Sequence, residues 1–118
     1  MRKWVLAVAM VAAMPAAALA ADAEAGKTVF NKCKACHQAD KNAVGPHLGG
    51  VVGRAAGSVA DYNYSEPLKN SGITWDEKKL DEWLQGPSKM VPGTKMIFAG
   101  IKDETDRGNL IEYLKTLK

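Results

Sequence analysis

Three stretches of the chain repeat small or apolar residues with the period of an α-helix. The first follows Asp22, a residue type that caps helix N-termini, and is predicted to run from about Ala23 to Lys34. Its regular positions recur at spacings of three and four along one face, which is typical of a packed helix: Gly26, Val29, Phe30 and Cys33.

The second and third helices are marked by their start signals. Thr74-Trp75-Asp76-Glu77 has the pattern of a capping box, and Gly86-Pro87 is expected to stop this helix. One face of the second helix is formed by Leu80, Trp83 and Leu84. The third helix is predicted to start near Asp103 or Glu104 and to reach the C-terminus, with an inward face formed by Leu110, Ile111, Leu114 and Leu117.

The rest of the chain is expected to form loops. A shorter helical turn is predicted from Ser65 to Asn70, ended by Gly72. No alternating stretch is long enough to predict a strand, so the expected fold class is all-α. Two long loops rich in Gly and Pro lie at Gly45–Tyr64 and Gly86–Lys102, and loops of this length in a small domain are usually functional. They are expected to wrap a ligand.

Residues 1–20 have a different character. They combine a basic start at Arg2 and Lys3, an apolar run too short to span a bilayer, and the small-x-small site Ala18-Leu19-Ala20. This is the pattern of a cleaved secretory signal peptide, and it predicts an exported, soluble chain with one domain over residues 21–118. A retained anchor helix is the alternative.

Removing this segment changes the charge balance. The full chain has 16 Lys and Arg against 13 Asp and Glu; without Arg2 and Lys3, 14 remain against the same 13. A nearly neutral domain without a basic stripe does not indicate a nucleic-acid partner. A domain of about 100 residues with few large aromatic side chains is at the small end for a self-sufficient core. That composition is a reason to look for a large apolar cofactor.

One motif carries distinctive chemistry. Cys33 and Cys36 are the two cysteines of the chain, and His37 follows at once. On a helical turn the two thiols lie on one face, at the spacing of two vinyl groups on one porphyrin edge, and each can add across a vinyl to form a thioether. The next residue then turns its imidazole toward the iron. Cys-x-x-Cys-His is the sequence sign of a covalently attached c-type haem.

Three other interpretations of these residues are weaker. A disulfide would not need His37. A thioredoxin-like pair would need a βαβ context, which the pattern lacks. A zinc site would need a fourth ligand, and the adjacent Cys36 and His37 point in awkward directions for one tetrahedron. Covalent haem is therefore the preferred interpretation.

An iron bound by His37 has a second axial position, for which Met96, Met90 and His47 are the candidates. Met96 follows Pro92-Gly93, a rigid turn that can present a thioether across the haem face. Met90 fits packing at the haem periphery. His47 lies only ten residues after His37, which makes the opposite face difficult to reach, although a bis-histidine iron stays an alternative.

From these residues the chain resembles the class I cytochromes c, in the mitochondrial-like branch that includes soluble bacterial relatives. The resemblance covers about Asp22 to Lys118. Five stretches in the family order carry it: Cys33-Lys34-Ala35-Cys36-His37, Val44-Gly45-Pro46-His47-Leu48, Val52-Gly53-Arg54, Gly72-Ile73-Thr74-Trp75, and Pro92-Gly93-Thr94-Lys95-Met96-Ile97-Phe98-Ala99-Gly100-Ile101.

The resemblance implies a cytochrome c fold, with three main helices, a short helix and long loops wrapped around one haem c. It implies that Cys33 and Cys36 form the thioethers and that His37 and Met96 bind the iron. The carbonyl of Pro46 would accept the other ring N–H of His37. The haem propionates would be held by Arg54, Tyr64 and Trp75.

The resemblance also implies packing and departures. Gly26 and Phe30 would cross the last helix at Leu110 and Tyr113. His47 stands where the family often has Asn, which adds a titratable group near the haem. Trp83 stands where the family usually has Tyr and, unlike Tyr, accepts no hydrogen bond, so the hydrogen bonding near Met96 is expected to differ.

The expected function is that of a soluble periplasmic one-electron carrier, not an enzyme. Two strong axial ligands leave no open position for oxygen or substrate, and a thioether raises the redox potential relative to a second imidazole. The alternatives are a haem peroxidase or a small-gas sensor in which Met96 leaves the iron.

The expected partners are redox proteins such as a membrane cytochrome c reductase or oxidase, a reaction centre or a dehydrogenase, met by a monomer. A face rich in lysine around the exposed haem edge would steer them: Lys32, Lys34, Lys89, Lys95 and Lys102. Acidic residues of the second helix would form the opposite pole: Asp76, Glu77, Asp81 and Glu82.

Overall fold

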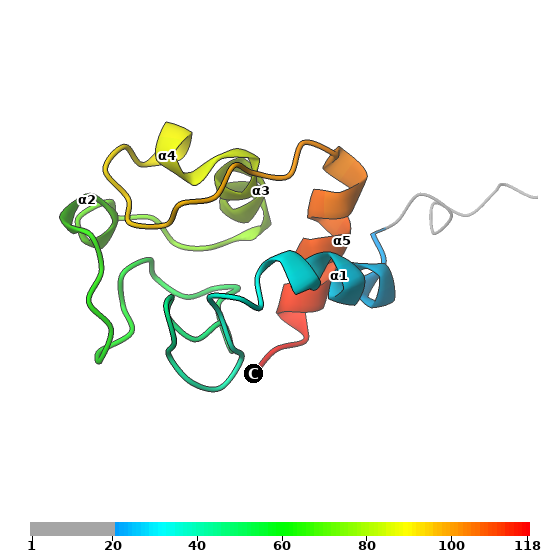
Figure 1. Ribbon diagram of the computed structural model, residues 1–118, viewed down its shortest axis with the longest axis horizontal. Helices are drawn as coiled ribbons and strands as arrows, with labels where there is room; N and C mark the ends of the chain where they lie inside the picture. The colour runs from blue at the N-terminus through cyan, green and yellow to red at the C-terminus, as the bar shows by residue number, and fades with distance from the viewer. Residues whose placement is uncertain (1–20) are drawn as a thin grey trace, which may run out of the picture.

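The computed structural model describes residues 21–118, so the predicted signal peptide lies outside the described residues. The helices run in the order α1 (Ala23–Val29), the 3₁₀ helix η2 (Phe30–Lys32), α2 (Glu66–Lys69), α3 (Glu77–Gln85), α4 (Pro87–Met90) and α5 (Glu104–Lys115) (Figure 1). In this part of the chain no strand forms; an isolated bridge joins Ala55 and Thr74. The all-α prediction is confirmed.

The first and last helices cross and pack against each other at one end of the molecule (Figure 1). Gly26 of α1 lies at the crossing: a Cβ built there would lie 1.9 Å from the backbone oxygen of Asn109. Phe30 and Tyr113 close the same contact, with ring centroids 5.1 Å apart. A small residue and two aromatic rings therefore join the first and last described helices, as the family resemblance implied.

The first helix is shorter than predicted. Asp22 caps it by accepting the N–H of Glu24, as expected, but the α-helix ends at Val29 instead of Lys34. The chain then tightens into η2, whose last bond runs from the N–H of Cys33 to the carbonyl of Phe30 at 2.8 Å. A 3₁₀ turn is a common way to satisfy the last carbonyls of a helix. The cysteine motif therefore begins where the regular helix has ended.

The start of α3 also differs from the prediction. Asp76 is the N-cap, and its carboxylate accepts the N–H of Lys79 at 2.7 Å. Thr74 does not cap because it is extended and bridges to Ala55. The predicted stop at Gly86 is correct, but Pro87 then begins α4 within the segment that was predicted to be a loop. Proline fits the first turn of a helix because its missing N–H would have no partner there.

The remaining helices agree with the sequence pattern. Ser65 caps α2, and Asp103 caps α5 by accepting the N–H groups of Thr105 and Asp106. α5 ends at Lys115, short of the predicted C-terminus. Its inward face is buried at Leu110, Ile111 and Leu114. Leu117, the fourth residue predicted for this face, lies beyond the end of α5 and is only partly buried.

The core joins α3 to the segment before it. Trp83 of α3 meets Trp75 with ring centroids 5.1 Å apart in an edge-to-face arrangement. Both indoles are buried, together with Leu80 and Leu84. Residues of the loops at 45–64 and 91–101 line one cavity together with Leu80, Trp83 and Leu84 of this core, and this cavity is the candidate site.

Candidate haem site

A cavity of about 330 Å³ lies between the cysteine motif and the long loops. Its volume falls in the range of sites that hold small molecules and cofactors. The chain segments that line it are far apart in sequence, and they bring together every residue proposed for the site: Cys33, Cys36, His37, Pro46, Arg54, Tyr64, Trp75 and Met96. The sequence-predicted set is therefore one spatial cluster.

The cysteine motif forms a single turn. The N–H groups of Cys36 and His37 both bond to the carbonyl of Cys33, at 3.1 and 2.9 Å. This helical geometry keeps the two thiols and the imidazole on the same cavity wall although the regular helix ended earlier. No disulfide joins Cys33 and Cys36.

Burial affects the chemistry of the first thiol. Desolvation raises the pKa of Cys33 to about 11; the neighbouring Cys36 adds to the rise and Lys32 opposes it. Cys33 is therefore a protonated thiol at neutral pH rather than a thiolate nucleophile. That state does not suit a thiol–disulfide exchange enzyme.

His37 is held in the orientation that a metal ligand needs. Only 9% of the residue is exposed, and its Nδ1 lies 2.9 Å from the carbonyl oxygen of Pro46. Because a carbonyl only accepts, Nδ1 carries the proton and Nε2 keeps its lone pair. Gly45 backs the ring closely, since a Cβ there would lie 2.4 Å from His37 Cε1. Burial lowers the pKa of His37 and favours neutral imidazole, the form that binds metal.

Arg54 is a half-buried cation that lacks a full set of partners. Its Nη1 donates to the carbonyl of Gly49 at 3.3 Å, but its Nε is buried with no hydrogen-bond partner. Burial lowers the pKa of Arg54, although the nearby Tyr64 opposes this. A buried guanidinium N–H without an acceptor is costly unless an anion binds it. An anionic group in this cavity would meet that need.

Tyr64 and Trp75 occupy the same wall as Arg54. The hydroxyl oxygen of Tyr64 accepts the N–H of Val59 at 3.1 Å, so its own hydrogen stays free to donate. Trp75 is held by its backbone, whose N–H bonds to the carbonyl of Arg54 at 2.9 Å. The wall therefore offers a cation and an O–H donor beside a buried indole.

Met96 enters the cavity from the opposite part of the chain. Thr94 closes the turn before it, bonding to the carbonyl of Val91 at 3.1 Å and accepting the N–H of Met96 on its hydroxyl at 3.3 Å. Gly93 adopts φ +90°, a conformation that favours glycine. The rival candidates Met90 and His47 do not line the cavity, whereas Met96 does.

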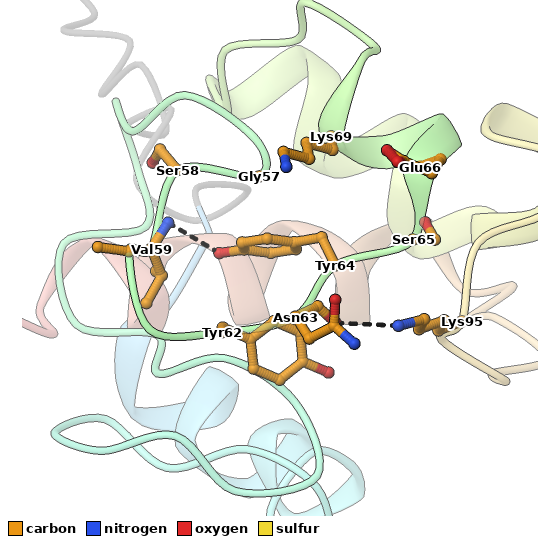
Figure 2. Close-up of a pocket in the computed structure, with 11 residues that line it drawn as sticks. Gly57, Ser58, Val59, Tyr62, Asn63, Tyr64, Ser65, Glu66, Lys69 and Lys95 are labelled. Atoms are coloured by element: carbon orange, nitrogen blue, oxygen red, sulfur yellow. Dashed lines mark hydrogen bonds between the residues drawn. The ribbon is translucent and has the colours of Figure 1, made fainter.

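A second hollow of about 450 Å³ shares a wall with the cavity (Figure 2). Tyr62 and Tyr64 form part of this wall, with ring centroids 4.8 Å apart. Across its rim, Lys95 donates from Nζ to the carbonyl of Asn63 at 3.2 Å. The hollow has no cysteine, histidine or methionine in its lining, so the ligand chemistry gathers in the first cavity.

The sequence did not predict the residues that join the loops around the cavity. Asn42 accepts the N–H of His47 at 2.8 Å and donates to the carboxylate of Asp61 at 2.9 Å. Tyr62 donates to the carbonyl of Val44 at 2.7 Å. The bonds of Asn42 to Asp61 and of Tyr62 to Val44 join residues 19 and 18 positions apart, so no local pattern marks them.

The acidic pole predicted on α3 is largely engaged in structural contacts. Asp76 caps the helix, Asp81 pairs with Arg107 at 2.7 Å, and Glu77 pairs with Lys115 at 2.9 Å. By contrast, the five lysines of the predicted basic face are all exposed: Lys32, Lys34, Lys89, Lys95 and Lys102.

The cavity fits the cofactor that the motif predicts. Paired thiols, a neutral imidazole and a thioether share it with an orphaned buried guanidinium N–H, and that last group suits a carboxylate-bearing ligand. A zinc site is not supported: within residues 21–118 no group of three or more His, Cys, Asp and Glu could hold a metal ion. None of the helices described there is long and apolar enough to cross a bilayer.

Comparisons with known proteins give the family. The model of the cytochrome c family matches residues 23–118. Cytochrome c-554 of Methylosinus trichosporium is 54% identical over 101 residues, which cover 83% of this chain and 76% of that protein. Cytochrome c2 of Blastochloris viridis is 47% identical over 118 residues, covering 98% of this chain and 93% of that one.

A solved structure agrees with these relatives. Cytochrome cH from Methylobacterium extorquens superposes with a TM-score of 0.79 and is 55% identical, covering 80% of this chain and 98% of that one. The family carries one covalently attached haem c with its iron, and Cys33 and Cys36 fit its attachment. The chain belongs to the cytochrome c family and is a monohaem electron carrier rather than an enzyme.

Proposed function

We propose that the chain is a periplasmic one-electron shuttle whose iron is bound by His37 and Met96. The observation that carries this is the placement of both side chains in one cavity with Cys33 and Cys36. The two cysteines would hold the haem as thioethers, and the haem supplies a reversible one-electron iron couple. The chain then sets the potential and limits access to the iron.

The rest of the cavity supports the same assignment. Pro46 fixes the tautomer of His37 through its carbonyl, which leaves Nε2 for the iron. Arg54 and Tyr64 would bind the propionates, since one has an unpartnered N–H and the other a free hydroxyl hydrogen. Trp75 would do so through its indole N–H, the only donor on that ring.

A thioether opposite the imidazole explains why a carrier is favoured over the alternatives. A haem peroxidase or a gas sensor needs an iron position that is open or can open. Two strong protein ligands would leave the iron no such position. A peroxidase also needs a distal acid-base group, and His47, the candidate that the sequence offers, does not line the cavity. The same absence argues against His47 as the sixth ligand.

Delivery and docking complete the proposal. Cleavage after Ala20 would release the domain that starts at Ala21 into the periplasm. The five exposed lysines would steer it toward acidic patches on membrane or soluble redox enzymes, with fast and weak association. The rate of electron transfer between the chain and these enzymes should fall as ionic strength rises, because salt screens exposed charges.

The test is a redox titration of the purified holoprotein with its optical spectrum. The ferric protein should show the charge-transfer absorption of a Met–iron bond, and the Met96→Leu variant should lose it and have a lower potential while the haem stays attached. Met90→Leu and His47→Gln are matched controls and should keep the band. A high-spin ferric spectrum of the unchanged protein, or loss of the band only in His47→Gln, would overturn the assignment.

A further inference from the structure

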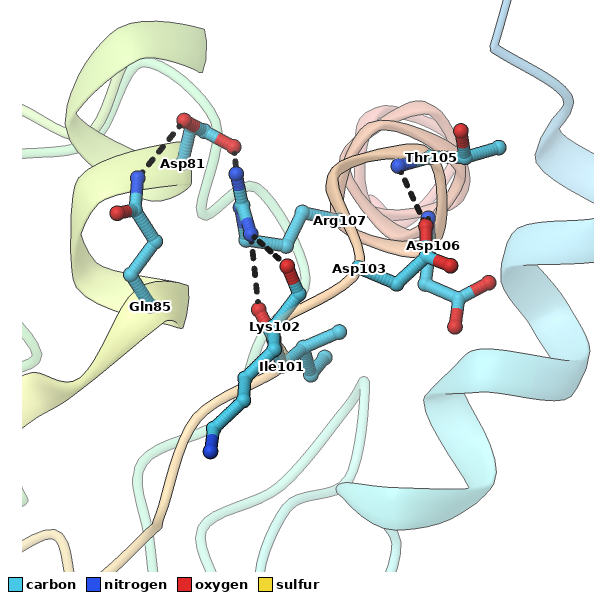
Figure 3. Close-up of polar contacts among 8 residues, drawn as sticks. All are labelled: Asp81, Gln85, Ile101, Lys102, Asp103, Thr105, Asp106 and Arg107. Atoms are coloured by element: carbon cyan, nitrogen blue, oxygen red, sulfur yellow. Dashed lines mark hydrogen bonds and ion pairs between the residues drawn. The ribbon is translucent and has the colours of Figure 1, made fainter.

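Arg107 is a buried cation outside the candidate haem site. Its side chain is 9% exposed, and it lies on α5 rather than on either loop that lines the cavity. Its Nε donates to Asp81 at 2.7 Å, and its Nη1 donates to the carbonyls of Ile101 and Lys102, both at 3.0 Å (Figure 3). One guanidinium thus joins α5 and α3 to residues 101 and 102, at the end of the segment that follows Met96.

Both oxygens of the partner carboxylate, Asp81, accept a hydrogen bond. While Asp81 accepts from Arg107 on Oδ1, its Oδ2 accepts the side-chain amide of Gln85 at 3.1 Å (Figure 3). The carboxylate therefore orients the guanidinium with one oxygen and is itself fixed to α3 by the other. Such charge-assisted bonds are stronger and more directional than neutral ones.

The segment that Arg107 binds, residues 100–102, packs against the end of α3. The N–H of Ile101 donates to the carbonyl of Leu84 at 2.7 Å. Gly100 adopts φ +100°, and a Cβ there would lie 2.2 Å from the backbone oxygen of Gln85. Gly100 and Ile101 are therefore an anchor point in direct contact with the end of α3.

Met96 lies between this anchor and the turn at Val91–Thr94. In the described part of the chain, the backbone of residues 97–100 makes no hydrogen bond, and Ile97 is 99% exposed. The position of the Met96 side chain relative to the core thus depends on the anchors at its two ends. Lys95 bonds to Asn63 on the turn side, and Arg107 holds the other side.

We propose that Arg107 is a positioning residue for the sixth iron ligand: by holding the carbonyls of Ile101 and Lys102 while paired with Asp81, it sets how readily Met96 leaves the iron. The inference rests on the proposed ligation by Met96. It assigns this α5 residue a role at the iron although the residue does not line the cavity.

The test is competition by imidazole for the iron of the ferric holoprotein at fixed neutral pH. Imidazole binds only when Met96 leaves, so its association constant, followed by loss of the Met–iron band, measures how firmly the loop holds Met96. Arg107→Met keeps an apolar stem and removes the guanidinium. It should raise the association constant by about tenfold or more, the effect of losing bonds from a charged donor. Asp81→Asn should raise it by a smaller factor.

Lys115→Met is the matched control. Lys115 also joins α5 to α3, through Glu77 at 2.9 Å, but it makes no hydrogen bond or ion pair with residues 91–102. Loss of this exposed pair should change the imidazole constant by less than about twofold. Guanidinium unfolding of every variant separates a loose loop from a weaker fold. If Arg107→Met does not fold, Arg107→Lys, which keeps the charge but not the fork, should give an intermediate rise.

Two outcomes would overturn the idea, and they differ from failure of the proposed ligation. An imidazole constant for Arg107→Met or Arg107→Lys that matches the unchanged protein would exclude a positioning role. So would a rise no larger than that of Lys115→Met for an equal loss of stability. Absence of a Met–iron band from the unchanged protein would instead refute the ligation by Met96 itself, before any variant is compared.

Discussion

The close contact at Gly26 predicts a large effect from one methyl group. In Gly26→Ala the new Cβ would lie 1.9 Å from Asn109 O, 2.5 Å from Asn109 C and 2.9 Å from the Cβ of Tyr113. The first two atoms are backbone, so α1 has to move away from α5 instead of a side chain turning aside. Overfilling a packed contact costs typically about 1–3 kcal/mol.

Helix propensity works against this cost and sets the size of the net effect. Alanine is favoured over glycine inside a helix by about 1 kcal/mol. Because Gly26 lies within α1, the overpacking must exceed that gain for the variant to be less stable. Three contacts below 3.0 Å, two of them to backbone, place the expected loss toward the upper end, at a net of about 1–2 kcal/mol.

Gly108→Ala is the control for this prediction. Gly108 lies within α5, and a Cβ there would meet only the Cβ of Ala21, at an ordinary contact distance of 3.7 Å. That variant should gain up to about 1 kcal/mol from helix propensity alone.

Guanidinium unfolding of the two holoproteins provides the assay. With a slope of roughly 4 kcal/mol per molar, Gly26→Ala should lower the midpoint by about 0.3–0.5 M and Gly108→Ala should raise it slightly. If the Gly26→Ala midpoint rises as the Gly108→Ala midpoint does, or does not fall, the reasoning is refuted, because the crossing at Gly26 then tolerates a side chain.

Two further predictions concern the cavity. Gly45→Ala should displace the His37 imidazole, since its Cβ would lie 2.4 Å from Cε1, and should lower the yield of holoprotein, whereas Gly86→Ala, whose Cβ meets the flexible Lys89 at 3.4 Å, should not. Arg54→Met should lower the midpoint potential by tens of millivolts, because removing a positive charge favours ferric iron. For one electron, roughly 60 mV corresponds to a tenfold change in the equilibrium constant. An unchanged potential would exclude Arg54 from the propionate site.

Helix positions could be predicted where the signal is local. Asp22 caps α1 as predicted, and the caps Ser65 and Asp103 lie at the predicted starts of α2 and α5, because a cap bonds to N–H groups only two or three residues ahead. The inward face of α5 followed from its spacing for the same reason.

The errors lie where a distant contact decided the outcome. Thr74 and Asp76 both offer a capping side chain, and sequence alone could not rank them. In the fold Thr74 is extended against Ala55, and the neighbouring Trp75 exchanges backbone bonds with residues 53 and 54, so the helix starts only after Asp76. Likewise, there was no local sign of the contacts of Asn42 with Asp61 and of Arg107 with Asp81, because both join segments that are far apart along the chain.

The candidate site was predictable for a different reason. Cys33, Cys36 and His37 are adjacent in sequence, so their chemistry can be inferred before any fold is known. Arg54 and Tyr64 could be assigned only through the family resemblance, and the unpartnered Nε of Arg54 now gives a physical argument for that role.

The two proposed iron ligands are supported by different parts of the fold. His37 lies at the end of the turn that begins at Cys33, just after η2, and it is braced by Pro46 and Gly45, so its position depends on the terminal helix crossing and one loop. Met96 is bonded through its N–H to Thr94 in the preceding turn, but residues 97–100 after it make no backbone hydrogen bond in the described part of the chain, and the next anchor is the pair of carbonyls that Arg107 holds. Local opening draws on segments with few internal bonds, and it costs less than global unfolding. Loss of Met96 from the iron should therefore precede unfolding, while His37 and the covalent attachment stay in place. The hydrogen bonds of Arg107 would then set the difference in free energy between loss of Met96 and global unfolding. They stabilise the loop around Met96 more directly than they stabilise the crossing of α1 and α5.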